Sequence, residues 1–329
     1  MRQGFFAFLA WGTLVCSARA DGPELVGVEK IWDRAPHSAF TDLIRWRDRF
    51  YCVFRESEGH VGGDGIIRVL SSDDGRAWDS VASLSETGID LRDPKLSITP
   101  DDRLMIVMGG SQYDGGKILK GRQPRVSFSG DGRAWTPPRP VLSEGEWLWR
   151  VTWNDGKAYG VSYGAPKDSE WPLKLFRSND GVNYDLVTKL EVTGQPNETT
   201  LRFLPDGEMI ALVRREAAAD GVAWIGTSRE PYRDWKWQPT KHRVGGPNFI
   251  RLHDGSLWAA GRSYPGGAKT VLARMTTDSY EPALTLPSGG DCSYPGLVWH
   301  DGLLWMSYYS SHEGKSAIYL ARIRLPKGH

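Results

Sequence analysis

Residues 198–215 read ETTLRFLPDGEMIALVRR, an apolar strand, a turn at Asp206-Gly207 and a second apolar strand. Asp-Gly between two apolar runs is the strongest short-range sequence signal for a β-hairpin. The same pattern recurs about every 50 residues, a repeat of supersecondary size. Its turns contain Asp102, Asp155, Asp206, Asp254 and Asp301. An earlier version without the glycine, FTDLIRWRDRFYCVFRES, occupies residues 40–57. Six hairpins at one spacing predict a repeat architecture.

A second, shorter motif follows the first hairpins. It reads SDDGRAW at 72–78, SGDGRAW at 129–135 and SNDGVNY at 178–184, and decayed forms occur at 227–235 and 276–280. The motif predicts a tight turn, because the aspartate side chain caps backbone N–H groups and the glycine takes a positive φ. Two hairpins per repeat make a four-stranded antiparallel sheet, so we predict an all-β fold, a six-bladed β-propeller. Sustained helical periodicity is absent, which argues against a βαβ fold.

The N-terminus has the pattern of a targeting segment. A basic Arg2 precedes an apolar run over residues 5–15 and small residues that end at Ala20, as in a signal peptide cleaved after that alanine. A lipoprotein signal through Cys16 fits less well, because Val15 stands where a small residue is usual. We therefore expect residues 1–20 to be a signal peptide and 21–329 to form one propeller domain, secreted or periplasmic.

The composition of the 329 residues limits the function. With 41 basic and 40 acidic residues the net charge is +1, and no basic block suggests binding to nucleic acid or to a membrane surface. No later apolar stretch is long enough to span a bilayer. Phosphate-loop, dinucleotide-binding and zinc-ligand motifs are absent, so we expect no cofactor and no metal. We also expect the protein to be a monomer. The exported chain keeps Cys52 and Cys292, which could form one disulfide or, as we favour, remain two buried thiols.

With this repeat, the chain resembles the sialidase superfamily of six-bladed propellers. The tight turns of that superfamily, called Asp boxes, have the form Ser-x-Asp-x-Gly-x-x-Trp. Residues 71–78 fit this form, and the turns that begin at Ser129 and Ser178 are one residue shorter. The fourth blade of a sialidase opens with Glu, passes through Leu-Pro-Asp-Gly and returns to an Arg, which residues 198–215 match. The resemblance covers the architecture of nearly the whole exported chain and only a few positions of its chemistry.

The resemblance also implies roles for individual residues. Glu198 matches the sialidase glutamate, Tyr294 in SYPGLVWHDG matches the tyrosine that opens the sixth blade, and Asp64 is similar to the loop aspartate before the first Asp box. The substrate-binding arginines of sialidases correspond to Arg262 and to either Arg214 or Arg215. Only one of the latter two can face inward, because consecutive residues of a strand face opposite sides. One departure is clear. Sialidases carry an arginine on the first strand, but HSAFTDLI at 37–44 has Ala39 at that place. The missing arginine argues against sialic acid as the substrate, although not against a glycosidase.

The propeller fold predicts which residues meet. The innermost strand of every blade begins near the central channel, so the residues that open these strands converge. We expect the mouth to be lined by Asp93, Arg150, Glu198, Asn248 and Tyr294, with Arg92 beside them and His37 as a further binding residue. A tyrosine is a poor nucleophile unless a base removes its proton. We expect Glu198 to be that base, Tyr294 to attack the anomeric carbon, and Asp64 or Asp93 to protonate the leaving oxygen in a retaining mechanism.

Several of these residues have structural alternatives. Glu198 could simply pair with Arg214, Asp64 could serve its glycine-rich turn, and Arg150 could stack on a neighbouring tryptophan. His312 could line the rim or lie in a surface loop. At the level of the whole protein we expect an exo-acting glycoside hydrolase that cleaves a terminal, acidic sugar from a glycan. The alternatives are a polysaccharide lyase and a glycan-binding propeller without catalysis.

Overall fold

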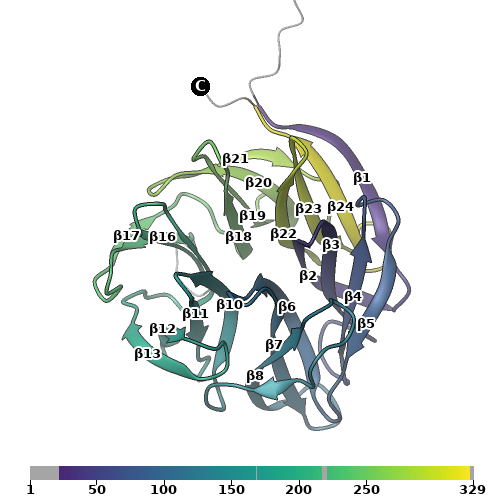
Figure 1. Ribbon diagram of the computed structural model, residues 1–329, viewed down its shortest axis with the longest axis horizontal. Coiled ribbons are helices and arrows are strands. Elements are labelled where there is room, and N and C mark those ends of the chain that lie inside the picture. The colour runs from purple at the N-terminus through teal and green to yellow at the C-terminus, as the bar shows by residue number, and fades with distance from the viewer. Residues whose placement is uncertain (1–21, 168, 217–220, 327–329) are drawn as a thin grey trace, which may run out of the picture.

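A computed structural model describes residues 22–167, 169–216 and 221–326. The predicted signal peptide, residues 1–20, lies outside these residues. Within them the chain forms 24 β-strands and no helix (Figure 1), and accordingly no helix there is long and apolar enough to cross a membrane. The all-β prediction is confirmed.

The strands form six four-stranded antiparallel sheets arranged as blades around a centre (Figure 1). Blade 1 contains β2 (His37–Trp46), β3 (Arg49–Ser57), β4 (Ile66–Ser72) and β5 (Asp79–Leu84), and blade 2 contains β6 (Asp90–Ile98), β7 (Leu104–Tyr113), β8 (Leu119–Ser129) and β9 (Arg139–Pro140). Blade 3 contains β10 (Trp147–Asn154), β11 (Lys157–Tyr163), β12 (Leu173–Ser178) and β13 (Tyr184–Lys189), and blade 4 contains β14 (Pro196–Phe203), β15 (Met209–Arg215), β16 (Trp224–Ser228) and β17 (Lys236–Pro239). Blade 5 contains β18 (Gly245–Arg251), β19 (Leu257–Ser263), β20 (Lys269–Met275) and β21 (Tyr280–Thr285). Blade 6 contains β22 (Cys292–His300), β23 (Leu303–Ser310), β24 (Ala317–Arg324) and the first strand of the chain, β1 (Glu24–Trp32).

The sixth blade closes the ring by joining the two ends of the described chain. β1 pairs antiparallel with β24, from Glu24 opposite Arg324 to Trp32 opposite Ile318. In every other blade the four strands follow one another in sequence. The blade that is built from both ends therefore holds the first and last strands together.

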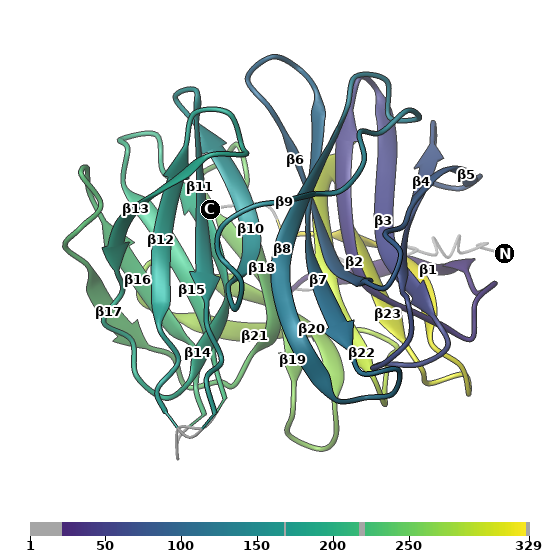
Figure 2. The ribbon, with the colours of Figure 1, turned by 90° about the horizontal axis from the view of Figure 1, so that it is seen from below.

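The repeated Asp-Gly hairpins lie at the inner half of each blade, as the sequence predicts. In blade 4, β14 pairs with β15 and the turn between Phe203 and Met209 contains Gly207 at a φ of 82°, a conformation that glycine adopts without strain. Seen from the side, the strands cross the thickness of the disc (Figure 2). The beginnings of all innermost strands therefore lie at one face, and the turns that join the third and fourth strands of a blade lie at the other.

Three of these outer turns share one hydrogen-bonding pattern. In blade 1 the Ser72 hydroxyl accepts from the Gly75 N–H, and the Asp74 carboxylate accepts from the N–H groups of Arg76 and Ala77. The turns of blades 2 and 3 repeat it from Ser129 and from Ser178. The first turn therefore begins at Ser72 and has the same length as the other two, whereas the family pattern placed its start one residue earlier. The hydrogen bonds, rather than the spacing to Trp, define the motif.

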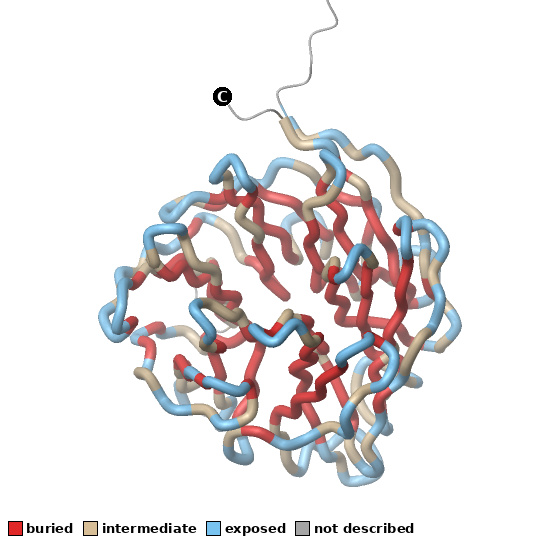
Figure 3. Tube along the Cα trace, in the orientation of Figure 1, coloured by how far each residue is buried: buried red, intermediate tan, exposed pale blue. Residues whose placement is uncertain are grey.

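The core lies between the blades and around the centre, while the outer strands and loops are exposed (Figure 3). Inner strands are buried on both faces because each blade packs against two neighbours; β15, for example, is buried at six of its seven positions. Cys52 and Cys292 lie in this core as free, buried thiols. Burial raises the pKa of both thiols. Between the two alternatives predicted from the sequence, the structure shows free thiols and no disulfide between these residues.

Candidate active site

A β-bulge at the same position in all six innermost strands builds the centre of the ring. In each blade two residues of the innermost strand lie opposite a single residue of the second strand, the arrangement that bends a strand and redirects its side chains. The bulged pairs are Phe40-Thr41, Asp93-Pro94, Trp149-Arg150, Asn197-Glu198, Gly246-Pro247 and Tyr294-Pro295. Four of them have a positive φ at the first residue.

The bulges bring residues from distant parts of the sequence into contact. The Tyr294 ring lies 5.1 Å from the Phe40 ring and 5.6 Å from the Trp149 ring, measured between centroids. Gly246 faces the same tyrosine so closely that a Cβ there would lie 2.8 Å from its ring. The prediction that strand-opening residues converge is therefore correct for Glu198, Tyr294 and their neighbours, and the bulge is the reason that they converge so tightly.

Tyr294 and Glu198 form a direct hydrogen bond at this centre. The Tyr294 hydroxyl donates to Glu198 Oε1 at 2.6 Å. The other oxygen, Oε2, accepts from Arg214 Nη1 at 2.7 Å and from the Gly246 N–H at 2.8 Å. Arg214 Nη1 also lies 3.0 Å from the Tyr294 hydroxyl. Every oxygen of this buried carboxylate is thus occupied by a donor, and one of the donors is the candidate nucleophile.

The electrostatics of the pair suit proton transfer. Burial alone would raise the pKa of Glu198, but the Arg214 charge and the three donated hydrogen bonds outweigh it and lower that pKa. The pKa of Tyr294 is raised well above its ordinary value, first by burial and then by the neighbouring Glu198 carboxylate. In the resting site the glutamate is therefore a carboxylate and the tyrosine a neutral phenol, which is the protonation state that a base and a nucleophile need.

The two consecutive arginines of β15 have different surroundings. Arg214 lies opposite the bulge and reaches the centre, where its second terminal nitrogen pairs with Glu216. Arg215 points away, because its guanidinium donates to the Thr193 carbonyl at 2.7 Å and lies 4.6 Å over the Trp224 ring. The structure thus settles the choice between the two arginines that alternation along the strand left open.

The other predicted arginines lie at different depths. Arg262 lies 5.5 Å from the Tyr294 ring and donates to the Cys292 carbonyl, to Tyr309 and to Asp291. Arg92 lies at the rim, where its Nη1 donates to Asp90, to the His60 carbonyl and to Tyr113.

Two residues predicted to line the mouth are committed to the channel wall instead. Arg150 forms a buried ion pair with Asp42, with 2.7 Å between Nη1 and Oδ2. Asn248 donates to the Pro295 carbonyl at 3.0 Å and accepts from Arg202 at 2.9 Å. Arg150 is the second residue of its bulge and Asn248 follows its bulge directly, and both side chains bond to residues of other blades. We therefore assign Arg150 and Asn248 to the support of the ring.

The two predicted proton donors have very different surroundings. Asp64 is exposed, and its carboxylate accepts from the Gly88 N–H at 3.0 Å. Asp93 is the first bulge residue of blade 2, with a φ of 49°, and its carboxylate forms no hydrogen bond with any residue that the structure describes. Burial raises the pKa of Asp93, against the opposing charges of Arg92 and Lys95. Of the two, Asp93 belongs to the centre, and Asp64 joins the loop between β3 and β4 to the loop between β5 and β6.

A buried lysine that no sequence motif indicates lies beside the tyrosine. Lys95 follows the bulge of blade 2, and its ammonium group lies 4.6 Å from the Trp149 ring and 5.8 Å from the Tyr294 ring. Burial lowers its pKa to about 8. Its signal in the sequence is weak, because an isolated lysine on an apolar strand is found at many sheet edges.

A second cluster lies at the rim and centres on Asp291, which also went unnoticed in the sequence. Asp291 Oδ2 contacts His37 Nε2 at 3.1 Å and His60 Nδ1 at 2.7 Å, and Oδ1 accepts from the Tyr309 hydroxyl at 2.7 Å. Burial opposes the ionisation of Asp291, but these partners lower its pKa well below the usual range. Proximity to Tyr294, three positions along the chain, is the signal that could have identified it.

The rim cluster has the residue types of a metal site. The ligand atoms of His37, His60 and Asp291 lie within 4.8 Å of one another. However, Arg262 Nη2 lies 3.3 Å from the same carboxylate, and a cation there would be repelled by the guanidinium. His312, also considered for the rim, contacts Ser310, and its ring lies 5.0 Å from the Tyr319 ring, measured between centroids.

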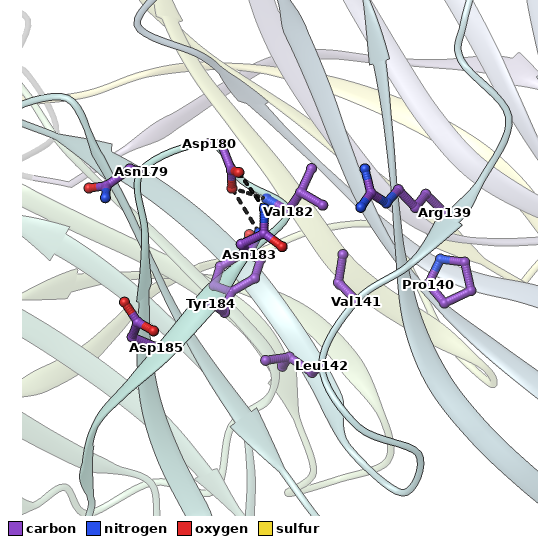
Figure 4. Close-up of a pocket in the computed structure, with 10 residues that line it drawn as sticks. All are labelled: Arg139, Pro140, Val141, Leu142, Asn179, Asp180, Val182, Asn183, Tyr184 and Asp185. Carbon is purple, nitrogen blue, oxygen red and sulfur yellow. Dashed lines mark hydrogen bonds between the residues drawn. The ribbon is translucent and has the colours of Figure 1, made fainter.

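A groove elsewhere on the propeller is unrelated to this centre. It has a volume of about 420 Å³ and runs between the end of blade 2 and the outer turn of blade 3 (Figure 4). Its lining includes Arg139 and Asp180, whose carboxylate is occupied by the N–H groups of Val182 and Asn183. None of the residues around Tyr294 contributes to it, so the groove is not the candidate active site.

Six four-stranded antiparallel blades with this centre define a sialidase-like six-bladed β-propeller. No protein-family model and no curated protein sequence matches the chain. Among solved structures, a protein of unknown function from Dyadobacter fermentans is similar, with 18% identity and a TM-score of 0.81, covering 92% of this chain and 99% of that chain.

Two similar structures are glycosidases. A Trypanosoma rangeli sialidase has 10% identity and a TM-score of 0.68, covering 88% of this chain and 55% of that chain. The α-L-arabinofuranosidase of Fusarium graminearum, solved with arabinobiose, has 14% identity and a TM-score of 0.69, covering 92% of this chain and 98% of that chain. At these identities the likeness establishes the sialidase-like fold.

Proposed function

We propose that this chain is an exported glycoside hydrolase that removes a terminal sugar with retention of configuration. The observation that carries the proposal is the 2.6 Å hydrogen bond from Tyr294 to an ionised, buried Glu198. A neutral phenol that already donates to a carboxylate can lose its proton as it attacks, and a tyrosine nucleophile is a known variant among glycosidases. The glycosidases among the similar structures support the same class of reaction.

In the first step the Tyr294 oxygen attacks the anomeric carbon while Glu198 takes the phenolic proton, and the bond to the leaving oxygen breaks. In the second step water attacks the anomeric carbon, the bond to the tyrosine oxygen breaks, and Glu198 returns the proton to that oxygen. The attacking water loses one proton, which replaces the proton that the leaving oxygen takes up in the first step. Arg214 keeps Glu198 ionised before the first step, and its position 3.0 Å from the phenol oxygen stabilises the charge that develops there.

The arginines favour a neutral sugar over the acidic sugar expected from the sequence. Recognition of a carboxylate relies on guanidinium donors that are free to form paired hydrogen bonds. Both terminal nitrogens of Arg214 contact carboxylates, and Arg262 already donates to two carbonyl or carboxylate groups and a hydroxyl. The position of the first sialidase arginine is taken by Ala39, which is fully buried. An α-L-arabinofuranoside is therefore the first probe, and the sialoside is the contrasting one.

The test is a panel of 4-methylumbelliferyl glycosides that includes the α-L-arabinofuranoside and the sialoside. We expect wild-type turnover of a neutral member, and a fall in kcat/KM of about 10²–10⁴-fold in Glu198→Gln, the range for loss of a general base. Glu191→Gln, at an exposed glutamate, is the matched control and should equal wild type. Proton NMR of the released sugar reports the retained configuration.

Three results would contradict parts of this proposal. Turnover that survives Glu198→Gln unchanged would exclude the assigned base. An ultraviolet-absorbing unsaturated product would indicate a lyase, and tight sugar binding without turnover would indicate a glycan-binding protein. Export is tested separately, by N-terminal sequencing of the protein recovered outside the cytoplasm, which we expect to begin at Asp21.

A further inference from the structure

The proposed reaction leaves one task without a residue, the protonation of the leaving oxygen. A donor for this step must face the side on which the leaving group departs to solvent. Asp64 is held by the Gly88 N–H. Asp93 is a bulge residue, with a φ of 49°, at the centre of the ring, which is where the bound sugar would lie.

His60 occupies the exit side of the centre. It lies in the loop between β3 and β4, at the same face as the beginnings of the innermost strands. Its ring is 5.2 Å from the Phe40 ring, which in turn is 5.1 Å from the Tyr294 ring. The Arg92 guanidinium donates to the His60 carbonyl at 2.9 Å and so holds this loop against blade 2. The His60 side chain is 49% exposed, which leaves room for a departing group.

Asp291 fixes the orientation of the His60 imidazole. Nδ1 lies 2.7 Å from Asp291 Oδ2, while Nε2 forms no hydrogen bond within the described part of the chain. The carboxylate is itself held by the Tyr309 hydroxyl, by His37 and by Arg262. A carboxylate that binds one imidazole nitrogen sets the tautomer and directs the other nitrogen toward the reacting group.

We propose that His60, oriented by Asp291, is the acid and base of the reaction, and that Asp93 positions the sugar; this inference rests on the proposed function. In the first step protonated His60 donates its Nε2 proton to the glycosidic oxygen as the carbon–oxygen bond breaks, and the leaving group departs as an alcohol. In the second step neutral His60 takes a proton from water as the water oxygen attacks the anomeric carbon. His60 is then protonated again, and the sum is one glycoside and one water giving one sugar and one alcohol.

The test compares leaving groups on the sugar that the panel identifies, as its phenyl and its 2,4-dinitrophenyl glycoside. A dinitrophenolate leaves without protonation, so loss of an acid affects it little. In His60→Asn, whose amide can still donate to Asp291, we expect kcat/KM for the phenyl glycoside to fall about 10²–10⁴-fold. For the dinitrophenyl glycoside we expect a fall of less than about tenfold, with azide accelerating turnover by replacing water. His253→Asn, at an exposed turn on the opposite face, should equal wild type.

Other outcomes separate this inference from the proposed function. In Asp93→Asn we expect equal losses for both leaving groups, as for a residue that positions the sugar. Three results would overturn the assignment of His60 without contradicting the proposed hydrolase activity. They are equal losses for both leaving groups in His60→Asn, a steep leaving-group dependence in Asp93→Asn, and inactivation of the wild type by a chelator. If the wild type turns over no member of the panel, the proposed hydrolase activity is contradicted, and so is the inference that rests on it. Matching melting temperatures of the variants exclude unfolding as the cause.

Discussion

Replacing Arg214 with methionine removes the charge that holds Glu198 ionised, and its effect can be estimated from the geometry. The Arg214 and Glu198 side chains are 12% and 7% exposed, and their charged atoms are 2.7 Å apart. At an effective dielectric constant of about 20 the Coulomb attraction is about 6 kcal/mol. Breaking such a buried pair costs about 3–5 kcal/mol, because the remaining charge is left unpaired. We expect Arg214→Met to lower the free energy of unfolding by this amount at pH 7.5.

The pH dependence distinguishes an unpaired charge from lost packing. In the wild type the pKa of Glu198 is lowered, so its contribution to stability is present above its unfolded pKa and is lost as the pH falls through the folded value. Without Arg214, burial dominates and raises the pKa of Glu198, so the penalty should shrink on acidification as the carboxyl takes up its proton. One proton changes stability by at most about 1.4 kcal/mol per pH unit. The loss at pH 5.0 should therefore be smaller than at pH 7.5 by up to about 3 kcal/mol.

The assay is urea denaturation of wild type, Arg214→Met, Glu198→Leu and the double variant at both pH values. The double variant should recover much of the loss, since an apolar pair of similar volume replaces the ion pair without an unpaired charge. Arg229→Met, in an exposed pair with Asp206, is the control and should change little at either pH. Equal losses in Arg214→Met at pH 5.0 and 7.5, with no recovery in the double variant, would refute the reasoning.

Three further predictions concern the scaffold. Gly132→Ala should destabilise the protein by about 2–4 kcal/mol in urea denaturation, because its φ of 74° strains an alanine and the new Cβ would lie 2.4 Å from a tyrosine ring. The control is Gly130→Ala in the same turn. A Cβ there would have nothing within 4 Å, so this variant should be nearly neutral. Asp180→Ala should cost about 1–2 kcal/mol, discounted for exposure. Backbone N–H groups outweigh desolvation and lower the pKa of Asp180, so the difference from wild type should begin to shrink below about pH 4 and be lost only as the pH falls through the lowered pKa. A constant difference from about pH 5 down to about pH 2 would contradict this. Dithiothreitol should leave the melting temperature unchanged, because Cys52 and Cys292 are free thiols, and a reductant-dependent melt would show a disulfide.

The repeat made the propeller predictable, because six hairpins with one spacing leave few other architectures. The meeting of Glu198 and Tyr294, 96 residues apart, followed from their positions at the openings of innermost strands. Whether Arg214 or Arg215 faces the centre could not be predicted, because the bulge at Asn197-Glu198 interrupts the alternation on which such a choice depends.

The rim of the site was less predictable than its centre. His60 and Asp291 lie in loops, and no periodicity fixes where a loop directs its side chains. The loop that contains His60 also contains Asp64, the residue type that the sialidase resemblance implies, and no sequence motif singles out the histidine. Arg150 and Asn248 were placed at the mouth because they open their strands, yet contacts with other blades, to Asp42 for Arg150 and to Pro295 for Asn248, hold them in the wall.

The pairing of β1 with β24 has a consequence for the order in which the protein folds. Glu24 and Arg324, joined by an ion pair, are 300 residues apart, while the strands of a hairpin such as β14 and β15 meet within about 20 residues. Bringing together chain positions this distant costs roughly 5 kcal/mol of chain entropy before any contact compensates it. Five blades can form from segments that are consecutive in the sequence, whereas the sixth is complete only when β1 pairs with β24. We therefore expect closure of the ring to be the slow, final event of folding, and until then the exposed edge of β24 is the part of the molecule most prone to pair with another chain.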